Sequence, residues 1–191
     1  MTERQEGGEH PQTQLPSAVD PKEIVHYYVD GGVRDGVAAS VFVRKAFKQP
    51  VKEEVRRVFS RKVSSTGSEI RAIRLAVEDA LSEGIDPSKV VIHTDQKALV
   101  RPNFRRVTPM SLLREELIGQ GFNLAYIPST HQIDETMDLS RVPKKVLNAL
   151  QVHNLVKDTL DPMIKANYKN KNGAAVGYLT AAAKQPSLNQ A

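Results

Sequence analysis

The sequence predicts an α/β domain, a five-stranded mixed sheet with helices packed on it in the order βββ-α-β-α-β-α. Three strand-like segments with short connections lie before residue 64, and strand-like and helix-like segments then alternate. Short connections favour antiparallel pairing, whereas alternation favours parallel strands joined by right-handed helical crossovers. The change from one pattern to the other therefore predicts a mixed sheet covered by helices.

The first three strands are predicted from β-branched and aromatic residues. Residues 24–29 form such a run, which ends at Asp30-Gly31-Gly32, a sequence typical of a turn. Apolar residues alternate with others over 37–43, and residues 53–63 carry spaced apolar residues among charges. We expect a buried first strand, a second strand, and a third strand that is exposed on one face.

Three helices and two more strands are predicted after this meander. Apolar residues at helical spacing predict a helix from Glu69 onward, a second over 109–118 and a third over 138–160. Short apolar runs at 90–92 and 123–127 predict the fourth and fifth strands. The fourth strand runs into Asp95.

Composition divides the chain into a folded domain and two tails. Residues 1–22 are polar with almost no large apolar residues, so we expect a disordered N-terminal tail. Residues 23–165 contain the predicted strands and helices. Residues 166–191 are rich in Asn, Lys, Gly, Ala and Gln and are predicted to form a flexible C-terminal tail. The 191 residues suffice for one domain of ordinary size.

Charge and residue usage limit the class of protein. The net charge of +5 and the isoelectric point of about 9.4 favour a polyanionic partner such as nucleic acid. The sequence has no cysteine, which excludes disulfides and thiolate metal ligands. No apolar run approaches the roughly 18 residues of a membrane-spanning helix, and the polar first residues are unlike a secretory signal. We therefore expect a cytoplasmic, intracellular protein without a membrane partner.

Three acidic residues occupy informative places in this plan. Asp30 is predicted to end the first strand, Glu69 to open the first helix and Asp95 to end the fourth strand. A right-handed crossover through the first helix allows strands one and four to be neighbours, which brings the three carboxyl groups together. Converging carboxylates repel one another, and hard cations such as Mg²⁺ relieve that repulsion because they prefer oxygen ligands.

Each of these acids also has an ordinary structural interpretation. Asp30 could start a turn, Glu69 could form a capping box with Thr66, and Asp95 could cap a following helix. The coincidence of all three on the required elements, in one order, favours a common site over three separate local roles.

This pattern resembles the ribonuclease H family, type 1, over about residues 24–150. The residues that carry the resemblance are Tyr28-Val29-Asp30-Gly31-Gly32, Ser68-Glu69-Ile70, Ile92-His93-Thr94-Asp95, Tyr126-Ile127-Pro128 and Asp138-Leu139-Ser140-Arg141. The acids follow the order Asp, Glu, Asp, Asp, whereas retroviral integrases of the same fold have their Glu last. The resemblance implies a ribonuclease H-like fold and a nuclease domain over 23–165.

The resemblance also implies roles for single residues. Asp30 would bridge two metal ions, Glu69 and Asp95 would hold one of them, and a last Asp would hold the other. Asp138 is preferred to Asp134 for that place, because its surroundings resemble the family motif and because a helix is expected to begin close to it. His131 lies in the preceding loop, where many members carry a histidine that assists proton transfer or product release; a solvated loop histidine is the alternative.

The implied function is a metal-dependent endoribonuclease that cleaves the RNA strand of RNA–DNA hybrids with two Mg²⁺ or Mn²⁺ ions. Two alternatives stay open at this point. One is a noncatalytic module of the same fold that binds nucleic acid or protein, and the other is a structure-specific DNA nuclease of the same fold that acts on junctions.

Overall fold

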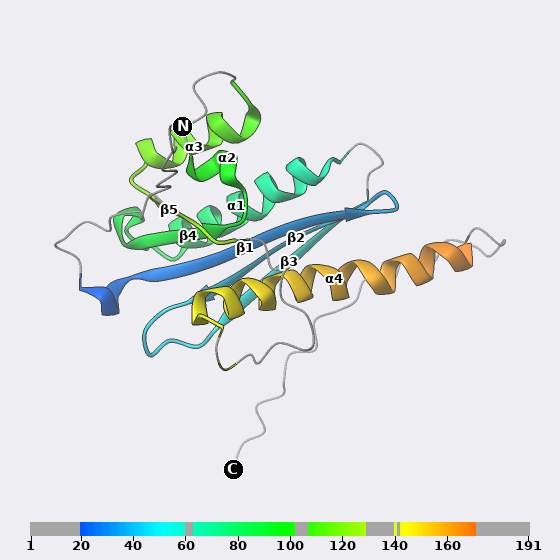
Figure 1. Ribbon diagram of the computed structural model, residues 1–191, viewed down its shortest axis with the longest axis horizontal. Coiled ribbons are helices and arrows are strands. Elements are labelled where there is room, and N and C mark those ends of the chain that lie inside the picture. Colours follow the sequence, from blue (N-terminus) through cyan, green and yellow to red (C-terminus); the bar gives the residue numbers. More distant parts are fainter. Residues whose placement is uncertain (1–19, 60–62, 102–106, 129–139, 141, 171–191) are drawn as a thin grey trace, which may run out of the picture.

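The computed structural model describes residues 20–59, 63–101, 107–128, 140 and 142–170. Within them, a five-stranded mixed sheet in the order β3-β2-β1-β4-β5 lies between two layers of helix (Figure 1). The strands are β1 (Val25–Arg34), β2 (Val37–Lys45), β3 (Lys52–Phe59), β4 (Val90–Thr94) and β5 (Asn123–Tyr126). The first three pair antiparallel, whereas β4 runs parallel to both β1 and β5. The predicted fold class is confirmed.

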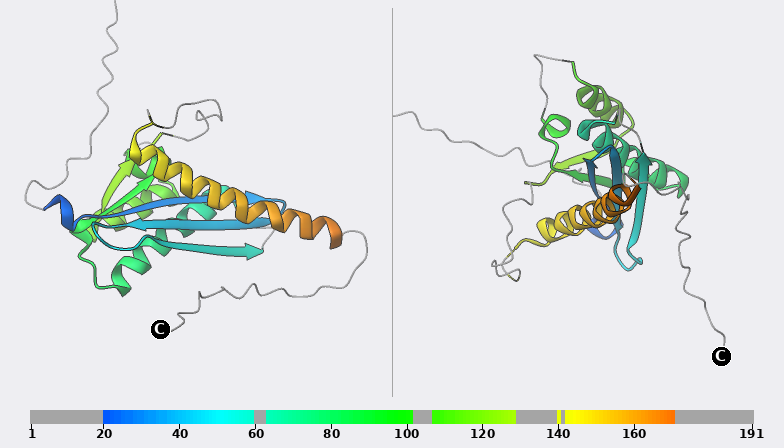
Figure 2. Two further views of the ribbon diagram at one scale, coloured as in Figure 1. Left: turned by 90° about the horizontal axis from the view of Figure 1, so that it is seen from below. Right: turned by 90° about the vertical axis from the view of Figure 1, so that its right-hand side faces the viewer.

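The helices divide between the two faces of the sheet. The helical elements are η1 (Pro21–Glu23), α1 (Ser65–Ser82), η2 (Pro87–Lys89), α2 (Lys97–Val100), α3 (Pro109–Gly119) and α4 (Lys144–Asn170). Figure 1 shows α1, α2 and α3 on one side and α4 on the other, and Figure 2 shows α4 running lengthwise along the sheet and past the ends of its strands. No helix among the described residues is both long and apolar enough to cross a membrane.

Two apolar cores follow from the alternation of side chains along the strands. Tyr27 and Val29 of β1 point into the core beneath α1 and α3, whereas Tyr28 points into the core beneath α4. Strand β2 contributes Phe42 to the first core and Val41 to the second, so it is buried on both faces. Burial on both faces holds β1 and β2 firmly, and β1 carries the first acid of the predicted site.

The Asp30-Gly31-Gly32 segment lies inside β1, so the expectation that it forms a turn is wrong. The chain instead turns at Asp35 and Gly36, whose φ angles of 49° and 79° are typical of a two-residue hairpin loop. Glycine is needed at positions 31 and 32 because helices pack closely against β1 there. A Cβ on Gly31 would lie 2.4 Å from the Ser68 carbonyl carbon, so α1 approaches the strand closely there.

Helix α1 begins one turn earlier than the sequence predicts. The side chain of Ser64 caps it, accepting a hydrogen bond from the backbone N–H of Gly67 at 3.0 Å. Glu69 therefore lies in the second turn rather than at the helix start, and the capping box between Thr66 and Glu69 is not formed. Because Glu69 does not cap the helix, its carboxyl group is free to point toward the sheet.

Helix α4 begins later than expected, at Lys144 rather than close to Asp138. Proline disfavours helical backbone in the residue before it, so Pro143 delays the start of the helix. The carbonyl of Pro143 accepts from the backbone N–H groups of Val146 and Leu147, at 2.8 and 3.2 Å. The expectation that this helix begins at residue 138 is therefore wrong, and Asp138 itself lies outside the described residues.

Candidate active site

Asp30 and Asp95 lie where the parallel pairing of β1 with β4 ends. Tyr28↔His93 is the last pair, and Asp30 and Asp95 each lie two residues beyond it. Since alternate residues of a strand share a face, Asp30 is on the face covered by α4, as Tyr28 is. Beyond the last pair, the edge of β1 is no longer covered by β4, and groups from either layer can reach it.

Glu69 reaches the same place from the opposite layer. Ser40 of β2 donates its hydroxyl hydrogen to the Ser68 carbonyl at 2.9 Å, and the absence of a side chain at Gly31 lets this part of α1 lie against β1. Glu69 is only 4% exposed, and its Oε2 has no hydrogen-bond partner among the described residues. A buried carboxyl oxygen without a partner is costly unless a ligand satisfies it.

The charges of the three acids act on one another. Burial, together with the nearby charges of Asp30 and Asp95, raises the pKa of Glu69 well above its ordinary value of 4.5. Burial is the largest of these causes, and repulsion from the two aspartates acts in the same direction. The structure therefore brings together the three acids that the sequence places on separate elements.

A histidine that the sequence analysis does not identify completes this group. The Nδ1 atom of His153, on α4, lies 3.1 Å from Oδ2 of Asp30. The hydrogen bond with Asp30 raises the pKa of His153, and the charges of Asp30 and Asp95 add to that effect. A shallow pocket is lined by Asp30, Asp95, His153, Ile127 and Ala149, among others. The helical spacing of Ala149, His153 and Val156 places His153 on the sheet-facing side of α4, but it gives no sign of a function.

Two further histidines, His93 in the lining of the pocket and His26 beside it, have lowered pKa values. His93 stacks on Tyr28 with 4.5 Å between ring centroids, and its Nε2 shares a hydrogen bond of 2.9 Å with Nδ1 of His26. Burial is the main cause that lowers the pKa of His93, to about 3. These rings add no positive charge at neutral pH, so they do not offset the three carboxyl groups.

The structural alternatives for the three acids do not hold. Asp30 is inside a strand, and Ser64 rather than Thr66 caps α1. Residue Gln96, not Asp95, is the N-cap of α2, and its amide donates to Asp95 Oδ1 at 3.2 Å. The other predicted site residues, His131, Asp134 and Asp138, lie outside the described residues.

The donor atoms of this group decide whether it can hold a metal ion. Within the described ranges, no three His, Asp or Glu side chains already form a group arranged to hold a metal. Asp30 instead directs Oδ1 to the backbone N–H of Gly31, at 2.8 Å, and Oδ2 to His153. Even so, carboxylate oxygens suit Mg²⁺ and Mn²⁺. An ion of this kind could bind the unpartnered Oε2 of Glu69 if the Asp30 carboxylate turned away from its present partners.

No family model matches the chain, and no curated protein matches it. Among solved structures, it is similar to LC11-RNase H1, isolated from compost by a metagenomic approach, with a TM-score of 0.52, 17% identity, and coverage of 74% of this chain and 99% of that chain. The RNase H1 of the halophilic archaeon Halobacterium salinarum NRC-1 is 20% identical, with a TM-score of 0.44 over 55% of this chain and 85% of that chain. The strand order and the similarity to LC11-RNase H1 together identify the fold as ribonuclease H-like.

Proposed function

We propose that this chain is a metal-dependent endoribonuclease that cleaves the RNA strand of RNA–DNA hybrids. The observation that carries the proposal is the meeting of Asp30, Glu69 and Asp95, from two strands and a helix, with a buried oxygen of Glu69 unpartnered. The ribonuclease H-like fold adds support, and the choice of a hybrid as substrate follows the resemblance of the sequence motifs to ribonuclease H, type 1. A fold by itself does not define a reaction, so the site has to be tested directly.

In the proposed reaction, the three carboxylates would hold two divalent cations, Mg²⁺ or Mn²⁺. When bound, such ions activate a water molecule and stabilise the leaving 3′ oxygen of the cleaved phosphodiester. Asp30 would contribute its carboxylate from the central strand β1, Glu69 from helix α1 and Asp95 from the end of β4. Glu69 must lose its proton before it can act as a ligand, so binding at this site is coupled to pH.

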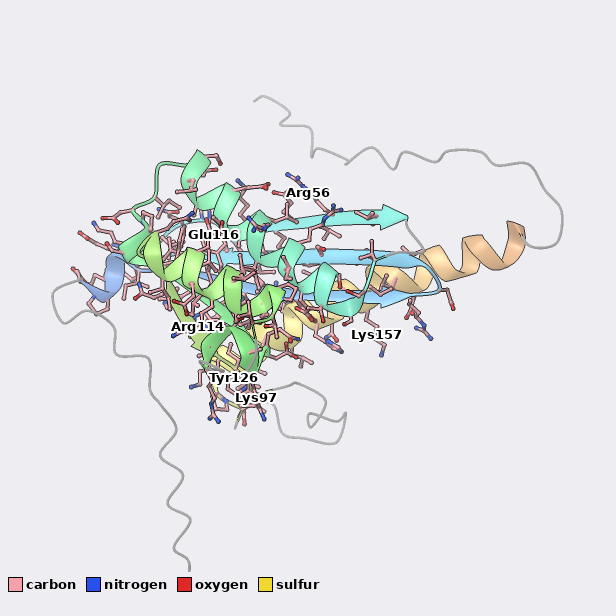
Figure 3. The ribbon with its side chains drawn as sticks, turned by 90° about the horizontal axis from the view of Figure 1, so that it is seen from above. Arg56, Lys97, Arg114, Glu116, Tyr126 and Lys157 are labelled. Atoms are coloured by element: carbon pink, nitrogen blue, oxygen red, sulfur yellow. The ribbon has the colours of Figure 1, made fainter. Side chains whose placement is uncertain are left out.

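Basic residues near the pocket suit contacts with phosphates. The Lys97 ammonium lies 5.8 Å from the centre of the Tyr126 ring, and Figure 3 shows this pair together. Lys97 follows Asp95 by two residues, and Lys157 lies one helical turn beyond His153 on α4. Phosphate contacts of this kind position a nucleic acid without reading its sequence.

The fourth carboxylate is proposed from the sequence motif only. We retain Asp138 in preference to Asp134 because its flanking residues resemble the family motif, and we retain His131 as the histidine that assists turnover. Asp138→Asn should reduce the cleavage rate much more than Asp134→Asn, and His131→Ala should reduce turnover with little effect on substrate binding. Parallel kinetics of the three variants test these assignments, and a reversed order of the two aspartates would refute the choice.

A cleavage assay tests the function. It compares labelled RNA–DNA hybrid, double-stranded RNA and branched DNA, each in the presence of Mg²⁺ and of EDTA. We expect metal-dependent cleavage of the hybrid, and Asp30→Asn should abolish cleavage without loss of folding. Asp158→Asn, an exposed change on α4, is the matched control and should cleave normally. Binding of the hybrid without cleavage would favour the noncatalytic module, and cleavage of branched DNA only would favour the junction nuclease.

A further inference from the structure

His153 reaches the site from α4, at a position where the motif resemblance places no functional residue. It lies on α4, between Val152 and Val156, two residues that pack in the core against β1 and β2. A Cβ on Gly32 would lie 2.7 Å from a methyl carbon of Val156, so the helix approaches β1 as closely as side chains allow. The imidazole is therefore presented to Asp30 by a packed helix.

The distance between His153 and Asp30 suits two ligands of one ion. In octahedral coordination, two donor atoms that are each about 2.1 Å from the ion and occupy adjacent positions lie about 3 Å apart. The Nδ1 atom of His153 lies 3.1 Å from Oδ2 of Asp30. A metal ion could thus bind both atoms with little change in the separation of the two side chains.

Access to this pair is also consistent with a ligand role. The His153 side chain is 35% exposed and that of Asp30 is 17% exposed, and both line the pocket that contains Asp95. On the other side of β1, the buried Oε2 of Glu69 lacks a hydrogen-bond partner within the described residues. The imidazole nitrogen and the carboxylate oxygens therefore approach Asp30 from opposite layers of the fold.

We propose that His153 is a direct protein ligand of a metal ion held by Asp30, which gives the site one nitrogen donor among its carboxylates. The proposal rests on the proposed function for the presence of the ion. Imidazole suits transition metals, whereas Mg²⁺ strongly prefers oxygen. The nitrogen donor shifts the preference of the site from Mg²⁺ toward Mn²⁺.

The competing role for His153 is a hydrogen bond that orients Asp30 without contact with the ion. Both roles predict weaker metal binding when the imidazole is removed. Only direct ligation predicts a nitrogen signal from the bound ion and a change in the ratio of Mn²⁺ to Mg²⁺ affinity. These two measurements therefore separate the roles.

The experiment uses the full chain without nucleic acid. Mn²⁺ bound to the wild type should show electron-spin-echo modulation from an imidazole nitrogen, and calorimetric competition should give its Mn²⁺ and Mg²⁺ affinities. His153→Ala and His153→Gln should lose the nitrogen modulation and about tenfold or more in Mn²⁺ affinity, because loss of even an outer-shell partner of a metal ligand costs about 10–100-fold. Their Mg²⁺ affinity should change much less, and His153→Asp should bind Mg²⁺ relatively better. Asn154→Ala, an exposed change next to it, is the control and should match the wild type.

Two results would overturn the proposal: nitrogen modulation that persists in His153→Ala, or a ratio of affinities that is the same in the wild type and in folded His153→Gln. Circular dichroism verifies that each variant is folded. Because no substrate is present, the outcome is independent of cleavage. Nitrogen modulation without hybrid cleavage would support His153 as a ligand and contradict the proposed nuclease function. Hybrid cleavage with an unchanged affinity ratio would support the nuclease function and contradict His153 as a ligand.

Discussion

Replacement of Glu69 by Gln should change the pH dependence of stability in the metal-free protein. The pKa of Glu69 is raised in the folded state, mainly by burial, and lies at its ordinary value of 4.5 in the unfolded chain. Between these two values the folded state binds more protons than the unfolded state. Stability must therefore fall as pH rises through this window.

The size of the effect follows from the linkage relation. One proton bound only in the folded state changes the free energy of unfolding by about 1.4 kcal/mol per pH unit. Because the raised pKa of Glu69 lies above neutral pH, the wild type should lose about 3 kcal/mol relative to Glu69→Gln between pH 5.5 and 7.5. His153 also has a raised pKa, so its contribution is lost as pH rises, but it is present in both proteins and largely cancels.

Urea unfolding in EDTA at several pH values measures this difference. Glu78→Gln on the same helix is the control, because the Glu78 side chain is 63% exposed, and it should follow the wild type. Addition of Mg²⁺ or Mn²⁺ should flatten the wild-type slope, since a cation favours the ionised form of Glu69. A difference between wild type and Glu69→Gln that is constant from pH 5.5 to 7.5 would refute the reasoning.

Three further predictions concern packing, a buried hydrogen bond and the partner. Gly31→Ala should destabilise the protein by about 3 kcal/mol, since its Cβ would overlap the Ser68 backbone, whereas Gly119→Ala, with open space around it, should be nearly neutral; urea unfolding of both tests this. Tyr27→Phe should cost about 2 kcal/mol by the same assay, because the Tyr27 hydroxyl donates to buried Asp79 at 2.8 Å. Hybrid affinity should fall steeply with salt if the contacts are mainly to phosphates, and an affinity unchanged between 50 and 200 mM salt would count against that binding mode.

The order of the elements was predictable because it depends on local patterns. Strand-like runs and helical spacing place five strands and the three long helices in the order that the structure has. The three acids could be grouped because the carboxyl ends of neighbouring parallel strands meet at one edge, and β1 and β4 are neighbours. Neither inference needs any knowledge of how closely the layers pack.

The sequence predictions fail at residues whose role depends on a tertiary contact. Gly31 and Gly32 resemble a turn in sequence, yet they are glycine because helices approach both faces of β1. The short helix α2 has too few residues for a periodic signal. His153 was missed because a single histidine on an amphipathic helix has no local mark of function, and only the position of α4 over Asp30 gives it one.

The two glycines explain why the site lies at this point of the sheet. Residues 31 and 32 point to opposite faces, so α1 comes close to the backbone at one of them and α4 at the next. Asp30 precedes both, and each helix brings one polar side chain to its vicinity, Glu69 from α1 and His153 from α4. Larger side chains at 31 and 32 would move the helices outward and separate these groups from Asp30. The glycine pair therefore sets the distances between the groups of the candidate active site as well as the packing of the two layers.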